Sequence, residues 1–151
     1  MRILTWGYRG RTHFDIERII ESVSGEVTVI DVRRRASGGR IARGWSLKEI
    51  VTEVQPRRPG RAPFYYRHFA SLGNYGRSPG EWTRGPYAAG ALLDIIADYR
   101  GQTIILICAE QNAAECHRSQ VAETLAEILR AAGDECEIVH LPLESPCTEP
   151  S

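Results

Sequence analysis

The chain has 151 residues, of which 42% are hydrophobic and 25% charged. This is the length and composition of one globular domain with its own core. No run of about 18 consecutive apolar residues is present, which argues against a transmembrane helix and a membrane partner. The chain starts directly with a strand-like segment and lacks the features of a signal peptide. We therefore expect a cytoplasmic protein whose four cysteines are free thiols.

The formal net charge of zero hides a strong asymmetry along the chain. Residues 1–84 carry 16 basic and 8 acidic side chains, whereas residues 85–151 carry 3 and 11. Eighteen of the basic residues are arginines, whose planar guanidinium group can bond two oxygens of a phosphate or carboxylate at once. This pattern favours an anionic partner for the first half. The alternative is that the two halves neutralise each other in the fold.

The first half of the chain predicts alternating strands and helices. Residues 3–6 read as a short buried strand, followed by a loop with two glycines. Apolar residues at helical spacing predict a helix over residues 14–23. Residues 27–32 are β-branched and nearly all apolar, which is typical of a parallel strand covered on both faces. After a basic loop, a capping box predicts a helix over residues 46–54.

The middle of the chain is less regular. A connector rich in proline and arginine leads to residues 64–69, which have the composition of a short strand. Residues 70–86 are rich in glycine, proline and serine and predict a long loop, a feature that is often functional in a compact domain. Residues 87–99 then predict a helix with a leucine and isoleucine core.

The last third contains the clearest elements. Residues 102–108 predict a buried strand, and residues 116–132 a long amphipathic helix that ends before a glycine. Residues 137–141 predict a last strand. The remaining residues, 142–151, include three prolines and predict a disordered tail.

This order of elements predicts a single Rossmann-like α/β domain over residues 1–141. Its open, mostly parallel sheet should have helices on both faces, in three layers. Ligands bind such sheets beyond the C-terminal ends of the strands. We therefore expect the polar residues that follow the predicted strands, together with the start of the last helix, to line one concave pocket. The pocket residues are Tyr8, Asp31, Arg33, Cys108, Glu110, Cys116 and Arg118, and Trp6, Arg9 and His140 are expected along the same edge of the sheet.

Cys116, His117 and Arg118 form the start of the last predicted helix. The first turn of a helix has unpaired backbone N–H groups and a partial positive charge, so it binds anions and lowers the pKa of a cysteine. This segment therefore predicts a nucleophilic cysteine or an anion cradle. The alternative is an inert thiol with two solvated neighbours.

Cys108 and Glu110 follow the clearest strand. A carboxylate at such a position is either a general acid or base with a raised pKa or a structural acid with satisfied hydrogen bonds. A metal site built from Cys108, Cys116, His117 and a distant histidine would lack the Cys-x-x-Cys spacing of common zinc sites. We therefore predict no metal and no cofactor.

Asp31 and Arg33 occupy alternate positions at the end of a strand and so lie on one face. They are predicted as substrate-binding groups, with an internal ion pair as the alternative.

Several segments resemble a prokaryotic family known as domain of unknown function 488. The matching pieces cover nearly the whole chain, and the combination of Cys-Ala-Glu with Cys-His-Arg is the most specific of them. They are Gly7-Tyr8 with the arginine loop, Asp31-Val32-Arg33, Tyr66 and His68 with Leu72-Gly73, Cys108-Ala109-Glu110, Cys116-His117-Arg118 and Val139-His140. The resemblance implies an α/β fold and an enzyme site of unassigned reaction. Trp6 and Ala113-Ala114 depart from the family's pattern in ways that would alter the pocket.

Three functions compete at this point. The first is an enzyme acting on a small phosphorylated or nucleotide-like substrate, and its residues divide into catalytic and anion-binding groups. The catalytic candidates are Cys108, Glu110, Cys116, His117 and His140, and the anion-binding candidates are Tyr8, Arg9, Asp31, Arg33, His68 and Arg118. The second is a nucleic-acid-binding accessory domain that uses the arginine-rich half, with Trp6, Tyr8, Tyr65 or Tyr66 stacking on bases. The third is a structural or regulatory partner that has kept an enzyme-like fold.

Overall fold

A computed structural model describes residues 1–8, 13–23, 25–35, 64–78, 80–108 and 116–141. Within these ranges, five strands form one sheet in the order β3-β2-β4-β1-β5, and every neighbouring pair is parallel. The strands are β1 (Arg2–Gly7), β2 (Val27–Asp31), β3 (Phe64–His68), β4 (Thr103–Cys108) and β5 (Glu137–His140). The predicted open α/β sheet is confirmed.

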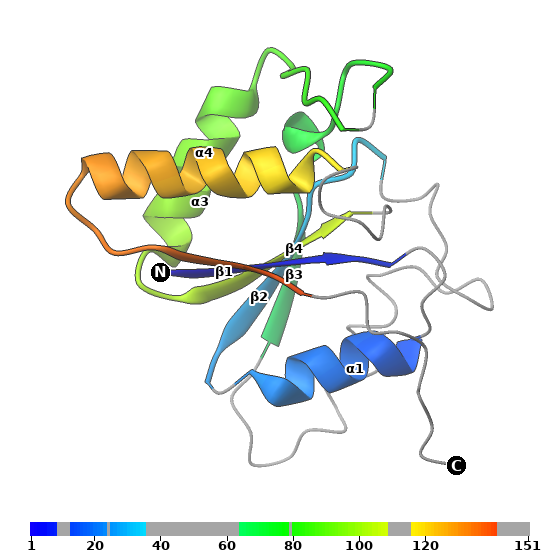
Figure 1. Ribbon diagram of the computed structural model, residues 1–151, viewed down its shortest axis with the longest axis vertical. Coiled ribbons are helices and arrows are strands. Elements are labelled where there is room, and N and C mark those ends of the chain that lie inside the picture. The colour runs from blue at the N-terminus through cyan, green and yellow to red at the C-terminus, as the bar shows by residue number, and fades with distance from the viewer. Residues whose placement is uncertain (9–12, 24, 36–63, 79, 109–115, 142–151) are drawn as a thin grey trace.

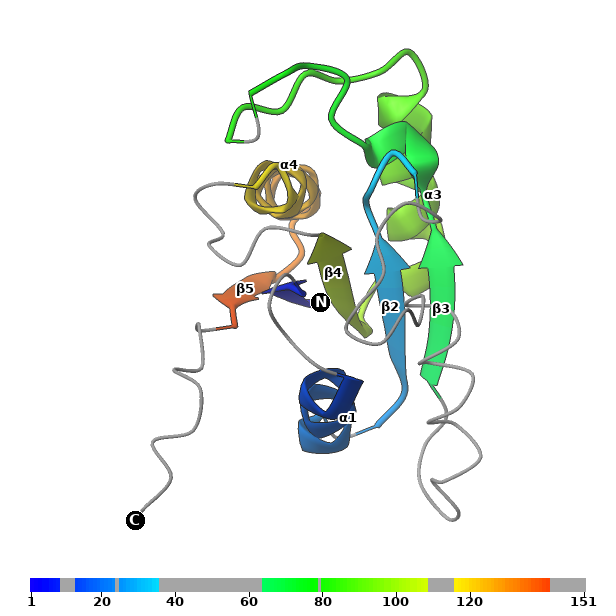
Figure 2. The same ribbon diagram turned by 90° about the vertical axis from the view of Figure 1, so that its right-hand side faces the viewer.

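Helices cover both faces of the sheet and give three layers (Figures 1 and 2). Helix α1 (His13–Ser22) packs on one face, and α3 (Ala88–Tyr99) and α4 (Arg118–Ala131) pack on the other. The short 3₁₀ helix η4 (Ala70–Leu72) lies on the same side as α3 and α4. No helix in these described ranges has both the length and the apolar character needed to cross a membrane.

The sheet is central because its middle strands are apolar on both sides. Along β4, Ile104, Leu106 and Cys108 pack toward α3 and α4, whereas Ile105 and Ile107 pack toward α1. This alternation follows from the strand's period of two residues. The same alternation determines on which face of the sheet each polar side chain at a strand end lies.

Strands β1 and β4 are neighbours, but the chain leaves them in opposite directions. After β1 it forms α1 on one face and continues to β2, while after β4 it forms α4 on the other face and continues to β5 (Figure 2). The two strands end level with each other, because Gly7 pairs with Cys108 and the amide of Tyr8 donates to the Cys108 carbonyl at 3.1 Å. This is the topological switch point of the sheet, where open α/β folds bind their ligands.

Four local details differ from the expectations or fall outside the described residues. The predicted loop over residues 70–86 contains η4, and α4 begins at Arg118, so that Cys116 precedes the helix and His117 occupies its N-cap position. The helix predicted over residues 46–54 and the tail predicted over residues 142–151 lie outside the described residues.

Gly73 allows the segment after η4 to lie directly against the segment after β2. A Cβ atom at Gly73 would lie 2.5 Å from the backbone Cα of Arg34. We therefore expect Gly73→Ala to lower the free energy of unfolding by about 1–3 kcal/mol through overpacking. Gly90→Ala in α3, where nothing lies within 4 Å of the added carbon, should raise it by about 0.5–1 kcal/mol. Urea denaturation of both variants tests this, and a Gly73→Ala protein as stable as the parent would contradict it.

Candidate active site

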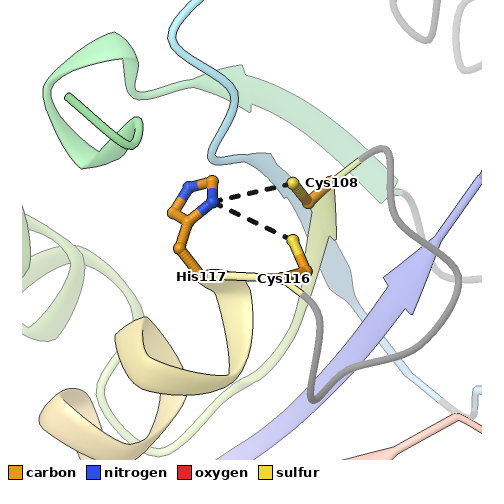
Figure 3. A group of neighbouring side chains, drawn as sticks. All are labelled: Cys108, Cys116 and His117. Carbon is orange, nitrogen blue, oxygen red and sulfur yellow. Dashed lines mark hydrogen bonds between the residues drawn. The ribbon is translucent and has the colours of Figure 1, made fainter. Parts of the chain in front are cut away.

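Two cysteines and a histidine meet at the C-terminal end of β4 (Figure 3). Cys108 is the last residue of β4, and Cys116 and His117 directly precede α4. The Nδ1 atom of His117 lies 3.8 Å from the sulfur of Cys108 and 3.9 Å from the sulfur of Cys116. All three ligand atoms lie within 4.8 Å of one another, and all three residues are buried. We call this group the thiol–imidazole cluster.

The main chain fixes the orientation of the His117 ring. Its Nε2 atom lies 2.8 Å from the carbonyl oxygen of Val32, in the segment that follows β2. Because a carbonyl oxygen only accepts hydrogen bonds, Nε2 carries a proton and donates it. The Nδ1 atom faces the two sulfurs, where it can accept a proton from a thiol and, once it carries that proton, donate it to the thiolate.

The neighbours of Cys116 lower the pKa of its thiol. A hydrogen bond from Cys108 is the largest cause that lowers the pKa of Cys116, and burial opposes it. Interactions with the His117 side chain and the backbone N–H of Arg118 lower the pKa further, to about 4. The Arg118 amide belongs to the first turn of α4, where unpaired backbone N–H groups favour a negative charge.

Cys136 provides a contrast within the same chain. It lies just before β5, is partly buried, and is also a free thiol. Burial raises the pKa of Cys136 above its ordinary value. Cys147 lies outside the described residues.

A second buried polar group, the Asp31 network, comprises Tyr8, Asp31, Arg33 and Tyr66. The carboxylate of Asp31 accepts hydrogen bonds from Arg33, from Nε at 2.9 Å and from Nη2 at 2.6 Å. It also accepts a bond of 2.6 Å from the hydroxyl of Tyr66. Arg33 donates from Nη1 to the hydroxyl of Tyr8 at 2.8 Å. Asp31 and Arg33 therefore form the internal ion pair that the sequence left open as an alternative.

Burial and the neighbouring charges shift the pKa values of three side chains in the Asp31 network. Burial lowers the pKa of Arg33, but the hydrogen bonds and charge of Asp31 outweigh it, so the net pKa is raised. Burial and then the Asp31 charge raise the pKa of Tyr66, which keeps its hydroxyl as a proton donor. Burial also raises the pKa of Tyr8, although Arg33 opposes this effect.

The expectation of a single pocket that holds both Asp31 and Arg118 needs correction. Asp31 pairs across the sheet with Ile107, and not with Cys108, so it shares the α1 face. Arg118 begins α4 on the opposite face. The physical reason is the alternation of side chains along each strand, combined with a register that the sequence does not reveal. Within the described part of the chain, the strand-end residues thus form two groups on opposite faces.

The main chain of residues 31–33 connects the two groups. The Val32 carbonyl accepts the bond from His117, and the Val32 amide donates to the carbonyl of Ile107 at 3.1 Å. The carbonyl of Arg33 is bonded to Nε2 of His68 at 2.6 Å. A movement of residues 31–33 would therefore change the hydrogen bonds of both the thiol–imidazole cluster and the Asp31 network.

The remaining predicted residues are distributed as follows. Arg118 is fully buried at the start of α4. His140 is exposed on the edge strand β5, where its Nδ1 lies 2.7 Å from the hydroxyl of Thr5, and it is outside the thiol–imidazole cluster. Arg9 and Glu110 lie outside the described residues, so their assigned roles stay predictions.

Two groups that hydrogen-bond to predicted site residues, the Val32 carbonyl and the Thr5 hydroxyl, were not predicted from the sequence. The Val32 carbonyl orients His117, but a backbone atom leaves no trace in a residue pattern. Thr5 is a fully buried polar residue in an apolar strand, and this irregularity was a usable signal that it has a hydrogen-bonding partner.

No family model matches this sequence, and neither the search of curated proteins nor that of solved structures gives a match. The resemblance to domain of unknown function 488 therefore stays a prediction.

Proposed function

We propose that this chain is an enzyme that acts on a small anionic substrate, phosphorylated or nucleotide-like, with the sulfur of Cys116 as its nucleophile. The observation that carries the proposal is the thiol–imidazole cluster at the end of β4. It combines a nucleophile, a proton acceptor and a second thiol at the switch point of a parallel sheet. A nucleophile next to a base that is itself oriented by a third group is the usual arrangement for covalent catalysis.

The proposed reaction has two steps. The thiol proton of Cys116 passes to Nδ1 of His117, and the resulting thiolate sulfur forms a bond to the electrophilic atom of the substrate. The bond to the leaving group then breaks, and the leaving group departs with the electron pair and takes the proton from His117. In the second step, water or an acceptor alcohol attacks the same atom and gives its proton to Nδ1 of His117, and the bond to sulfur breaks so that Cys116 leaves as a thiolate. The enzyme is then a hydrolase or a transferase, respectively. Because Cys116 is buried, the substrate reaches it after a local opening of the fold.

The preference for an anion is based on the start of α4. Its first backbone N–H groups and the charge of Arg118 favour a negatively charged group near Cys116.

The test is turnover of a panel of phosphomonoesters and nucleotides, with detection of a covalent adduct by intact-protein mass spectrometry. We expect Cys116→Ser to lower turnover of the best compound by at least about 1,000-fold, in line with the loss of a catalytic nucleophile. Cys136→Ser is the matched control and should leave turnover unchanged. Equal turnover by Cys116→Ser and the parent would refute the nucleophile, and a panel without any substrate would refute the substrate class.

A nucleic-acid-binding role is the second candidate, favoured by exposed aromatic rings and arginines. Tyr65 and Tyr87 are 47% and 75% exposed, and the guanidinium of Arg34 lies 4.2 Å from the centre of the Tyr75 ring. Such rings can stack on bases. Titration of labelled oligonucleotides of increasing length at two salt concentrations separates the candidates. Affinity that rises with length and falls steeply with salt would favour this role over the enzyme.

A further inference from the structure

We propose that Cys108, Cys116 and His117 also bind a thiophilic divalent metal ion, of which Zn²⁺ is the best fit, and that metal occupancy blocks the sulfur of Cys116. The metal site is argued from the positions, burial and donor chemistry of the three residues and does not depend on the proposed function. Only the blocking of catalysis rests on the proposed function.

The positions of the three ligand atoms suit one zinc ion. With zinc bonds of about 2.3 Å to sulfur and 2.0–2.1 Å to nitrogen, ligand atoms in a tetrahedral site lie roughly 3.5–3.8 Å apart. The two sulfur-to-Nδ1 distances in the cluster are 3.8 and 3.9 Å, and no pair of the three atoms exceeds 4.8 Å. Binding therefore requires small side-chain movements and no rearrangement of the backbone.

The surroundings of His117 resemble those of metal-binding histidines. Such a ring donates its other N–H to a carboxylate or a backbone carbonyl, which fixes the tautomer and directs the free lone pair at the metal. Here Nε2 is held by the Val32 carbonyl at 2.8 Å, and Nδ1 faces both sulfurs.

Charge balance also favours a cation in this position. Two thiolates buried side by side would repel each other and lose their hydration. A divalent cation neutralises both, so that the loaded cluster carries no net charge in the core. Cys108, Cys116 and His117 are each no more than 6% exposed, which keeps competing water away from the site.

The donor atoms select the metal. Two sulfurs and one imidazole nitrogen suit zinc and disfavour Mg²⁺ and Ca²⁺, which prefer oxygen ligands. Within the described ranges the cluster has these three members only, and a zinc ion held by three protein ligands has a fourth position for water or a small molecule. While its sulfur is bonded to the metal, Cys116 cannot attack a substrate.

The experiment uses the full chain, reduced and stripped of metal. Zn²⁺ is titrated in competition with a chromophoric chelator, and Co²⁺ serves as a spectroscopic probe through its thiolate-to-metal charge-transfer band. We expect one ion per chain and no competition from excess Mg²⁺. Cys108→Ser and His117→Gln should each weaken Zn²⁺ binding by about 100-fold or more, since even loss of an outer-shell partner costs 10–100-fold. Cys136→Ser is the control and should bind as the parent does.

The outcomes separate the two proposals. Absence of a thiolate band with Co²⁺ in the folded parent protein would overturn the metal site without reference to any variant. Equal Zn²⁺ affinity in Cys108→Ser and the parent would overturn it as well. If Zn²⁺ binds but no substrate is turned over, the metal site stands and the proposed enzyme function fails. If turnover is found and saturating Zn²⁺ leaves it unchanged, the blocking role fails.

Discussion

Replacing Asp31 with alanine is expected to lower the free energy of unfolding by about 3–5 kcal/mol, because removal of one partner leaves a buried charge without compensation. Asp31 is fully buried and Arg33 is 7% exposed. The hydroxyl of Tyr66 and the backbone N–H of Arg33 lose the same acceptor. The melting temperature should fall by roughly 6–20 °C in a chain of this length.

Two comparisons make this prediction specific. Asp98→Ala removes the partner of Arg67 in an exposed ion pair and should cost no more than about 1 kcal/mol. The double variant Asp31→Leu/Arg33→Met removes both charges and should regain most of the lost stability, since apolar replacements of a buried pair are often neutral. An Asp31→Ala protein within about 1 kcal/mol of the parent would show that the Asp31 network does not hold the end of β2 in place.

The fold was largely accessible from the sequence because its signals are local. The apolar segment of β4 is buried on both faces, and such runs between helices indicate a covered parallel strand. The periodicity of α4 likewise marks the face that packs on the sheet. The parallel pairing of β3 was harder to predict, because its pattern is mixed and it lies at the edge of the sheet.

The site was accessible only in part. The rule that ligands bind at strand ends correctly indicated that Cys108 and Cys116 lie at the same edge of the sheet, but it does not say which face each side chain occupies. That choice depends on register, which pairs Asp31 with Ile107. Strand order is equally invisible in the sequence, so the switch point between β1 and β4 emerged only from the structure.

The second large effect concerns the ionisation of the two kinds of thiol. With a pKa of about 4, Cys116 should be almost entirely thiolate at pH 6, whereas burial raises the pKa of Cys136 above its ordinary value and keeps that thiol protonated at this pH. The thiolate fractions of the two cysteines should therefore differ strongly at this pH. Because the folded pKa of Cys116 lies below its ordinary value, its thiolate persists as the pH falls and is lost only near pH 4.

Two variants identify the cause of this shift. The hydrogen bond from Cys108 is the largest cause that lowers the pKa of Cys116, so Cys108→Ala should move the ionisation of Cys116 to higher pH. His117→Gln should move it in the same direction, because the hydrogen bond and the charge of His117 also lower this pKa. If neither variant changes the ionisation of Cys116, the cluster does not act as a unit.

The most direct measurement is the pH dependence of alkylation in the reduced, chelator-treated protein, with each cysteine resolved by peptide mass spectrometry. Burial slows the reaction of Cys116 at every pH, so the shape of the profile is decisive and its absolute rate is not. From pH 5 to pH 8 the rate at Cys116 should change by less than about 3-fold, while the rate at Cys136 should rise about tenfold per pH unit, in proportion to its thiolate fraction. A Cys116 profile that rises in parallel with that of Cys136 would contradict a stabilised thiolate at the start of α4.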